Sequence, residues 1–288
     1  VLTACGSSKA QTDAAETTTE EAAAEETAAA EETADTDAQA ETGDLQVITA
    51  AATAVPHAEI LEAAKPILAE QGYDLQITVF DDYVQPNEVV EAGDIDCNYF
   101  QHIPYLNSYN EERGTHLVSV GEIHYEPIGI YAGTESDLSN IPDGADIAIP
   151  NDTTNEARAL LILQDNGIIT LKEGAGIDAT INDIAENPHN INFVEMEAAQ
   201  VSKVLSEVAF AVINGNYALD AGLNAQTDAL ASETSDSLAA QTYVNVVVVK
   251  EGNEDNEGVT ALVDVLKSDD IKKFIEETYE GAVVPFEG

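Results

Sequence analysis

The chain has 288 residues, and its 55 acidic side chains against ten lysines and arginines give a formal net charge of −45. A surface this acidic repels phosphate groups, which excludes nucleic acid and anionic lipid headgroups as partners. No stretch approaches 18 consecutive apolar residues, so the sequence predicts no membrane-spanning helix.

The first six residues contain the run Leu-Thr-Ala-Cys-Gly, which resembles a bacterial lipobox, the cleavage site of a lipoprotein signal peptide. We expect residues 1–5 to be the remnant of that signal, with Cys5 acylated as the first residue of the mature protein. The lipid would hold the chain on a bacterial cell membrane, facing the periplasm or the exterior. The alternative is a cysteine that stands there by chance.

Residues 6–43 are dominated by alanine, threonine and acidic residues. Between Ala10 and Gly43 there are 12 alanines, eight threonines and 11 acids, with no aromatic or branched aliphatic side chain. Such a segment cannot bury enough apolar surface to offset the entropy of ordering, so we predict a disordered acidic tether. A flexible chain of this length has an r.m.s. span of roughly 30–35 Å.

From residue 44 onward, strand-like runs alternate with helix-like runs. The expected strands cover residues 45–50, 75–80, 95–100, 127–131, 146–149, 192–195, 208–213 and 244–249. The expected helices cover residues 56–68, 86–90, 104–110, 156–164, 199–206, 259–266 and 271–278. This alternation predicts an α/β fold with mostly parallel sheets covered by helices.

The size of this part suits two lobes of about 120 residues each. We expect lobe I to comprise residues 44–122 and 243–288, and lobe II to comprise residues 123–242, so that the chain crosses between lobes twice. In open α/β sheets, ligands bind beyond the carboxyl ends of the strands. The cleft between the lobes is therefore the expected binding site.

Catalytic signatures are absent from the sequence. It contains no Gly-x-Ser-x-Gly, His-Glu-x-x-His or Cys-x-x-Cys motif and no glycine-rich phosphate loop, and its five histidines show no metal-ligand spacing. We therefore expect neither an enzyme nor a bound metal or cofactor. Cys97, the one cysteine besides Cys5, is expected to be a core residue.

Aromatic side chains concentrate in the run from Asp96 to Leu106, where an expected strand leads into a helix that begins with proline. Phe100, His102 and Tyr105 can form an aromatic wall at the cleft, with Tyr83 opposite. Such a wall suits an apolar, polarizable ligand group. The alternative is that these rings are ordinary core.

A second candidate segment covers residues 150–160, where a strand ends, a polar loop follows and a helix begins. Free backbone N–H groups at that helix start would attract an anion. Arg158, one of only two arginines, lies in the first turn or so, where a cation opposes the helix dipole. A bidentate contact with a ligand carboxylate would explain it, whereas the alternative is a surface ion pair.

Two asparagines interrupt or end apolar strands. Asn214 follows residues 208–213, and Asn245 lies within residues 244–249. A buried amide without partners costs stability, and the ammonium and carboxylate of a ligand could supply them. The alternative is hydrogen bonding to backbone at a hinge. Together these segments suit a zwitterion with an uncharged, fairly apolar side chain.

These motifs resemble the NlpA-type methionine-binding lipoproteins over residues 44–288. The resemblance is carried by the lipobox and by residues 96–106, 126–131, 151–160 and 243–246, in the family's order. It implies a type II periplasmic-binding-protein fold with a hinge and an interlobe ligand cleft. It also implies delivery of methionine, as the L form with the D form a further candidate, to an ABC permease and its ATPase.

The resemblance assigns the family's ligand contacts to particular residues of this chain. They are Tyr83, Phe100, His102, Tyr105, Arg158, Asn214 and Asn245, with Asn155 as a further position. Cys97 stands where the family usually has alanine, and we expect it to point away from the ligand. We expect a monomer. The alternatives are a binding protein for another small amino acid or a methionine-containing dipeptide, a surface hydrolase, or an adhesive lipoprotein.

Overall fold

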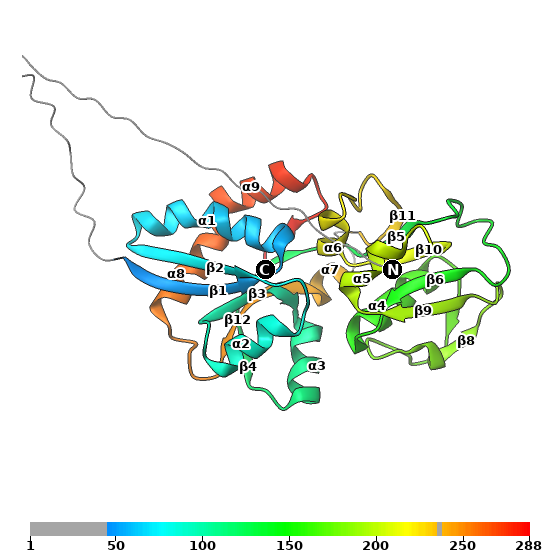
Figure 1. The fold of residues 1–288 in the computed structure, drawn as a ribbon, viewed down its shortest axis with the longest axis horizontal. Coiled ribbons are helices and arrows are strands. Elements are labelled where there is room, and N and C mark those ends of the chain that lie inside the picture. Colours follow the sequence, from blue (N-terminus) through cyan, green and yellow to red (C-terminus); the bar gives the residue numbers. More distant parts are fainter. Residues whose placement is uncertain (1–44, 235–237) are drawn as a thin grey trace, which may run out of the picture. The chain divides into compact units, whose positions relative to one another are not determined.

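The computed structural model describes residues 45–234 and 238–288 (Figure 1). The lipidation expected at Cys5, the signal remnant of residues 1–5 and the tether of residues 6–43 lie outside these ranges. Within them the elements form two groups, each built on its own sheet. No helix of this described part combines the length and the apolar character needed to cross a bilayer.

Lobe I is the group built on a six-stranded sheet. Its strands follow the order β13-β4-β12-β3-β1-β2, in which β1 is parallel to β2 and β3, and β12 is antiparallel to β3 and β4. Their bounds are β1 (Gln46–Ala52), β2 (Tyr73–Val79), β3 (Cys97–His102), β4 (Leu117–Tyr125), β12 (Val244–Lys250) and β13 (Val284–Pro285).

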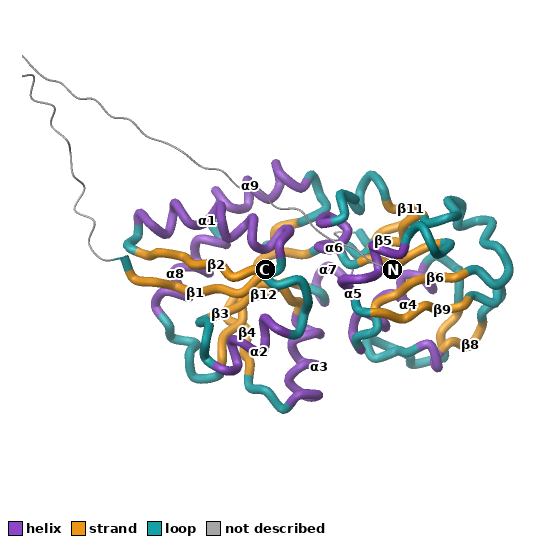
Figure 2. Tube along the Cα trace, viewed as in Figure 1, coloured by secondary structure: helices purple, strands orange, loops and turns teal. Residues whose placement is uncertain are grey.

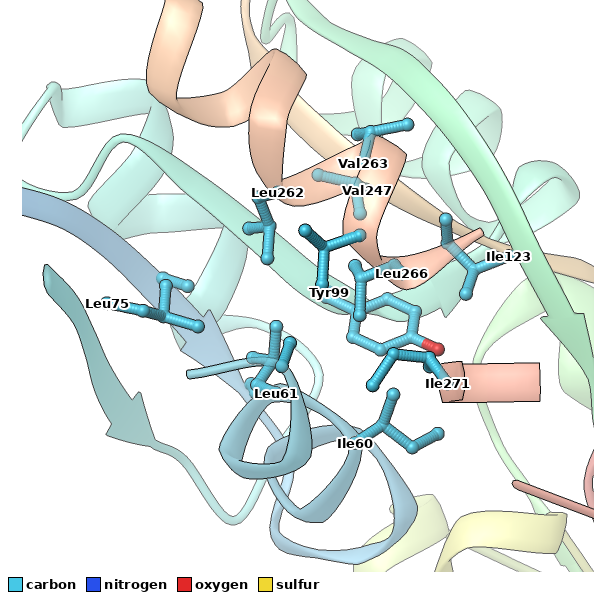
Figure 3. Close-up of a cluster of buried hydrophobic side chains, with 14 of the residues drawn as sticks. Ile60, Leu61, Leu75, Tyr99, Ile123, Val247, Leu262, Val263, Leu266 and Ile271 are labelled. Carbon is cyan, nitrogen blue, oxygen red and sulfur yellow. The ribbon is translucent and has the colours of Figure 1, made fainter. Parts of the chain in front are cut away.

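Helices cover both faces of the lobe I sheet. One face carries α1 (Glu59–Glu70), α8 (Glu257–Leu266) and α9 (Asp269–Tyr279), and the other carries α2 (Gln85–Ala92) and α3 (Ile103–Arg113). Side chains of α1, α8 and α9, among them Leu61, Leu262 and Ile271, surround Tyr99 of β3 (Figure 3). Burial of this apolar surface stabilises the lobe and fixes the strand ends that reach the other lobe.

Cys97, at the start of β3, belongs to the same cluster. Its thiol is fully buried and donates a hydrogen bond to the main-chain oxygen of Thr49, with an Sγ–O distance of 3.6 Å. Burial raises the pKa of the Cys97 thiol well above its usual value. The prediction that Cys97 is a core residue rather than a nucleophile is confirmed.

Lobe II is the group built on a five-stranded sheet of order β11-β5-β10-β6-β9. Here β6 is parallel to β9 and β10, and β5 is antiparallel to β10 and β11. The bounds are β5 (Gly129–Ala132), β6 (Asp146–Pro150), β9 (Asn192–Met196), β10 (Phe210–Ile213) and β11 (Ala229–Ser232), with a small pair of β7 (Thr170–Leu171) and β8 (Ile184–Glu186) beside it.

One long helix and several short ones complete lobe II (Figure 2). The long helix α4 (Thr153–Asp165) packs its leucines and isoleucines on one face of the sheet, and α5 (Ala198–Val201) and α6 (Gly215–Asp220) pack on the other. A further helix, α7 (Leu238–Thr242), precedes β12. The helix expected over residues 199–206 is shorter than predicted and continues as a 3-10 turn at Ser202–Val204.

The α/β prediction is confirmed, but the expectation of mostly parallel sheets is wrong. Each sheet is mixed, with antiparallel pairs at the strands next to the crossovers between lobes. A strand that ends at a crossover runs toward the other lobe, as β4 does, whereas a strand that begins at one runs away from it, as β5 and β12 do. A chain that crosses twice therefore reverses strand direction in both sheets.

Gly133, directly after β5, lies against the segment that precedes β10. Its N–H donates to the main-chain oxygen of Ala209 at 3.0 Å. A Cβ at Gly133 would lie 2.2 Å from the main-chain oxygen of Val208 and 2.6 Å from that of Leu205. Backbone oxygens cannot swing aside as a flexible side chain can, so only glycine fits this close approach.

We predict that Gly133→Ala lowers the free energy of unfolding by about 1–3 kcal/mol, because the added methyl group must displace backbone. The matched control is Gly176→Ala, whose Cβ would meet no atom within 4 Å. It should change stability by no more than about 0.5 kcal/mol. Urea unfolding followed by circular dichroism measures both, and equal effects of the two variants would contradict the packing described for Gly133.

Candidate ligand-binding site

A narrow pocket lies where β3 and β10 end and β12 begins. Residues of both lobes line it, and all eight residues singled out from the sequence are among them. The lining residues are Tyr83, Phe100, Gln101, His102, Tyr105, Glu126, Asn155, Arg158, Asn214, Gly215, Asn216 and Asn245.

Three rings form the apolar side of this cavity. The ring centroid of Tyr83 lies 5.8 Å from that of Phe100 and 5.6 Å from that of Tyr105. Tyr83 therefore lies beside the other two rings, not opposite them as expected. The Tyr83 hydroxyl donates to Asn216 Oδ1 at 2.5 Å and the Tyr105 hydroxyl to the main-chain oxygen of Tyr83 at 2.9 Å, so both hydroxyl groups are already bonded.

The helix that carries Arg158 begins earlier than predicted, and its start is already capped. Because α4 begins at Thr153, Arg158 lies in the second turn, not in the first. Asp152 Oδ1 accepts the N–H of Asn155 at 3.1 Å. A protein carboxylate thus occupies the place where free amides were expected to attract an anion, and that part of the prediction is wrong.

Arg158 is buried, with only 3% of its surface exposed, so the alternative of a surface residue is wrong, but its bidentate partner is an acid of the protein, Glu233, as that alternative expected. Its Nε donates to Glu233 Oε1 at 3.0 Å, and its Nη2 donates to Glu233 Oε2 at 2.5 Å and to the main-chain oxygen of Glu126 at 2.8 Å. Its guanidinium carbon lies 4.2 Å from the ring centroid of Tyr243. Burial alone would lower the pKa of Arg158, but the charge of Glu233 outweighs it and raises that pKa.

An imidazole and two amides connect the lobes beside Arg158. His102 Nε2 donates to Asn155 Oδ1 at 3.0 Å, and Asn214 Nδ2 donates to the same oxygen at 2.8 Å. His102 Nδ1 accepts the N–H of Tyr105, which places the imidazole proton on Nε2. Asn214 Oδ1 is buried and has no hydrogen-bond partner among the described residues, so it is an acceptor available to a ligand.

His57, His124 and Glu126 form a buried cluster that the sequence analysis did not predict. Glu126 Oε1 lies 2.6 Å from His124 Nε2 and 3.3 Å from His57 Nε2, which also lies 3.0 Å from Asn245 Oδ1. These three side chains are close enough to one another to raise the question of a metal site. The 2.6 Å contact is a hydrogen bond, however, because two ligand atoms that each lie about 2.0–2.1 Å from one tetrahedral zinc ion are more than about 3 Å apart. Burial lowers the pKa of His57 to about 4 and that of His124 to about 3, so both are neutral at pH 7.

The NlpA lipoprotein family model matches residues 48–287. The chain is 40% identical over 250 residues to the methionine-binding lipoprotein MetQ of Bacillus subtilis, which covers 85% of this chain and 90% of that protein. Among solved structures, a lipoprotein from Ruminococcus gnavus is 66% identical with a TM-score of 0.83, covering 84% of this chain and all of that one. A nutrient-binding protein from Burkholderia cenocepacia, solved bound to methionine, is 41% identical with a TM-score of 0.79, covering 83% and 99%.

The buried state of His102 predicts a pH dependence of stability. Burial, aided by the charge of Arg158, lowers the pKa of His102 from 6.5 to about 3. Between these values the unfolded chain binds a proton that the folded chain does not, so stability falls as pH falls. Relative to His102→Gln, the wild type should lose about 2 kcal/mol between pH 7 and pH 5.

Denaturant midpoints of both proteins at each pH measure this difference. Between pH 8 and pH 7 neither state gains much proton at this site, so the same pair should show almost no relative shift there. Parallel curves from pH 7 to pH 5 would mean that His102 titrates equally in the folded and unfolded states, contrary to its burial.

Proposed function

This chain belongs to the NlpA lipoprotein family, and from that premise we propose that it is the methionine-binding, substrate-binding lipoprotein of an ABC importer. One observation carries the proposal: a buried arginine and a wall of aromatic rings line one cavity between two lobes. The family makes the protein a lipid-anchored, extracytoplasmic one. The anchor would be at Cys5, with the lobes facing the periplasm or the exterior.

Arg158 is the group that would hold the ligand carboxylate. Its three hydrogen bonds to Glu233 and the Glu126 carbonyl fix the guanidinium plane, and a guanidinium has five N–H donors, so capacity remains. In a buried site, a charge-assisted bond of this kind is stronger than in water. Asn155, Asn214 and Asn245 supply neutral amides around the same position.

The three rings would receive the methionine side chain. Tyr83, Phe100 and Tyr105 present aromatic surface, and a thioether sulfur makes favourable contacts with such rings. His102 is neutral at pH 7, since burial lowers its pKa to about 3. A side chain carrying a charge would therefore find no counter-charge at this wall, which favours an apolar amino acid.

Capture of a ligand would require the lobes to separate and close again. Bonds that cross the cavity join Tyr83 of lobe I to Asn216 of lobe II and His102 of lobe I to Asn155 of lobe II. Opening would break them, with rotation at the two crossovers, near residues 126–128 and near residue 243. Closure on the ligand would exclude water, and the closed form would then dock on the permease, which the ATPase drives.

A methionine-containing dipeptide is a second candidate ligand. A hollow of about 360 Å³ adjoins the cavity and shares Tyr83 and Tyr105 with it. It is otherwise lined by residues 82, 84–85, 151–152, 197–199 and 217. A ligand longer than one residue could extend into it. We expect no turnover of either ligand, since the proposed role is capture and release.

We predict that Arg158→Ala weakens L-methionine binding at least about 30-fold, because the ligand carboxylate loses its charged partner. Arg158→Lys should recover part of the loss, since it keeps the charge without the planar fork. The matched control is Arg113→Ala, which removes the other arginine, whose side chain is half exposed and lies 3.9 Å from Glu88. It should bind as the wild type does.

Isothermal titration calorimetry with L-methionine, D-methionine and a methionine-containing dipeptide tests these statements together. A wild-type protein that binds none of the three would refute the proposed function. Binding that Arg158→Ala leaves unchanged would refute the carboxylate role alone. Tighter binding of the dipeptide than of methionine would favour the second candidate.

A further inference from the structure

Glu126 is a buried carboxylate in the first crossover, and it lines the cavity with only 5% of its surface exposed. Among the described residues, no lysine or arginine forms an ion pair with it. Its partners are the two neutral imidazoles of His57 and His124 and the N–H of Asn216. Burial raises the pKa of Glu126. An ionised carboxylate in such a place carries a desolvation cost of several kcal/mol that a cation would offset.

The two histidines hold one oxygen of this carboxylate in place. The Tyr99 hydroxyl bonds His124 Nδ1, and the Thr53 hydroxyl lies 2.8 Å from His57 Nδ1. If both hydroxyl groups donate, each imidazole carries its proton on Nε2. His124 then donates to Glu126 Oε1 at 2.6 Å, while His57 donates to Asn245 Oδ1 at 3.0 Å and lies 3.3 Å from Glu126 Oε1. Glu126 Oε1 is thus held by a neutral donor.

The second oxygen lies at a position that only a glycine leaves open. A Cβ at Gly215 would lie 3.0 Å from Glu126 Oε2 and 2.7 Å from Glu126 Cβ. Gly215 also lines the cavity, so the absence of a side chain there keeps space beside Oε2. The adjoining Asn214 offers its buried Oδ1, which has no partner among the described residues.

We propose that Glu126 binds the α-ammonium group of the ligand through Oε2, with Asn214 Oδ1 as the second acceptor. The inference rests on the proposed function and adds to it the group that recognises the amino end. An α-amino acid carries both charges on one carbon, so its site needs an anion and a cation close together. Arg158 and Glu126 both line the cavity, and Arg158 Nη2 donates to the main-chain oxygen of Glu126 at 2.8 Å.

The charge balance of the cavity supports the same assignment. Glu233 already neutralises Arg158, and His57, His102 and His124 are neutral at pH 7. Without Glu126, the ammonium end of a bound zwitterion would have only neutral asparagines as its protein partners. Glu126 supplies an opposite charge, and the ammonium in turn supplies the cation that Glu126 lacks.

A cycle that combines one protein change with one ligand change tests the pairing. The proteins are the wild type and Glu126→Gln, and the ligands are L-methionine and 4-(methylthio)butanoate, which lacks only the amino group. Calorimetry should show that Glu126→Gln weakens methionine binding at least about 30-fold. It should leave binding of the des-amino ligand within about threefold, because that ligand has no ammonium to lose.

The control is Glu135→Gln, an exposed glutamate after β5, which should leave both affinities unchanged. If Glu126→Gln weakened the binding of both ligands equally, the inference would be overturned. The proposed function would stand, because the wild type would still bind methionine. If Glu126→Gln does not fold, the affinities of the wild type for the two ligands still test the inference. A des-amino ligand that binds within about threefold of methionine would overturn the inference. A des-amino ligand that binds about 30-fold or more weakly than methionine would support it. A wild type that binds no methionine would overturn the proposed function first, and this inference with it.

Discussion

A buried guanidinium is the constraint on which the arrangement of the two lobes depends. Arg158 belongs to a helix of lobe II, yet it is bonded to Glu233 beside the second crossover and to the carbonyl of Glu126 in the first. Its guanidinium also lies over the ring of Tyr243, the residue directly before β12. A buried charge that loses its partner costs about 3–5 kcal/mol, so these segments stay together around it. The residues proposed to bind the ligand and the two crossovers between the lobes are therefore bonded to one another.

Around that ion pair the cavity is polar but almost free of further charge. Neutral histidines and asparagines satisfy one another across the lobes, as His102, Asn155 and Asn214 do. An acidic protein with a formal charge of −45 thus keeps a local environment in which one cation and one anion can each act on a ligand. The long-range field of the surface and the short-range chemistry of the site are separate properties, since solvent screens the first far more than the second.

Local periodicity was enough to find most strands and helices, and strand-to-loop junctions located the candidate site residues. The strand β4 was not predicted, because Gly121 and Glu122 interrupt its apolar pattern, and its pairing with the distant β12 leaves no local trace. Glu126 lay within a motif that was noticed, but one acid among 55 carries no signal of its own. His57 and His124 meet it only because folding joins segments 67 residues apart.

The position of β12 has a consequence for how the chain folds as it emerges. Lobe II is made of one continuous stretch, from β5 to β11, and can assemble as soon as that stretch is available. In the sheet of lobe I, β12 lies between β3 and β4, so this sheet cannot be completed until the chain as far as residue 250 is available. The helices α8 and α9, which cover the sheet, follow β12 in the chain. Export from the amino end would therefore leave the unpaired edges of β3 and β4 exposed longest, and this half of the molecule is where a chaperone would be needed.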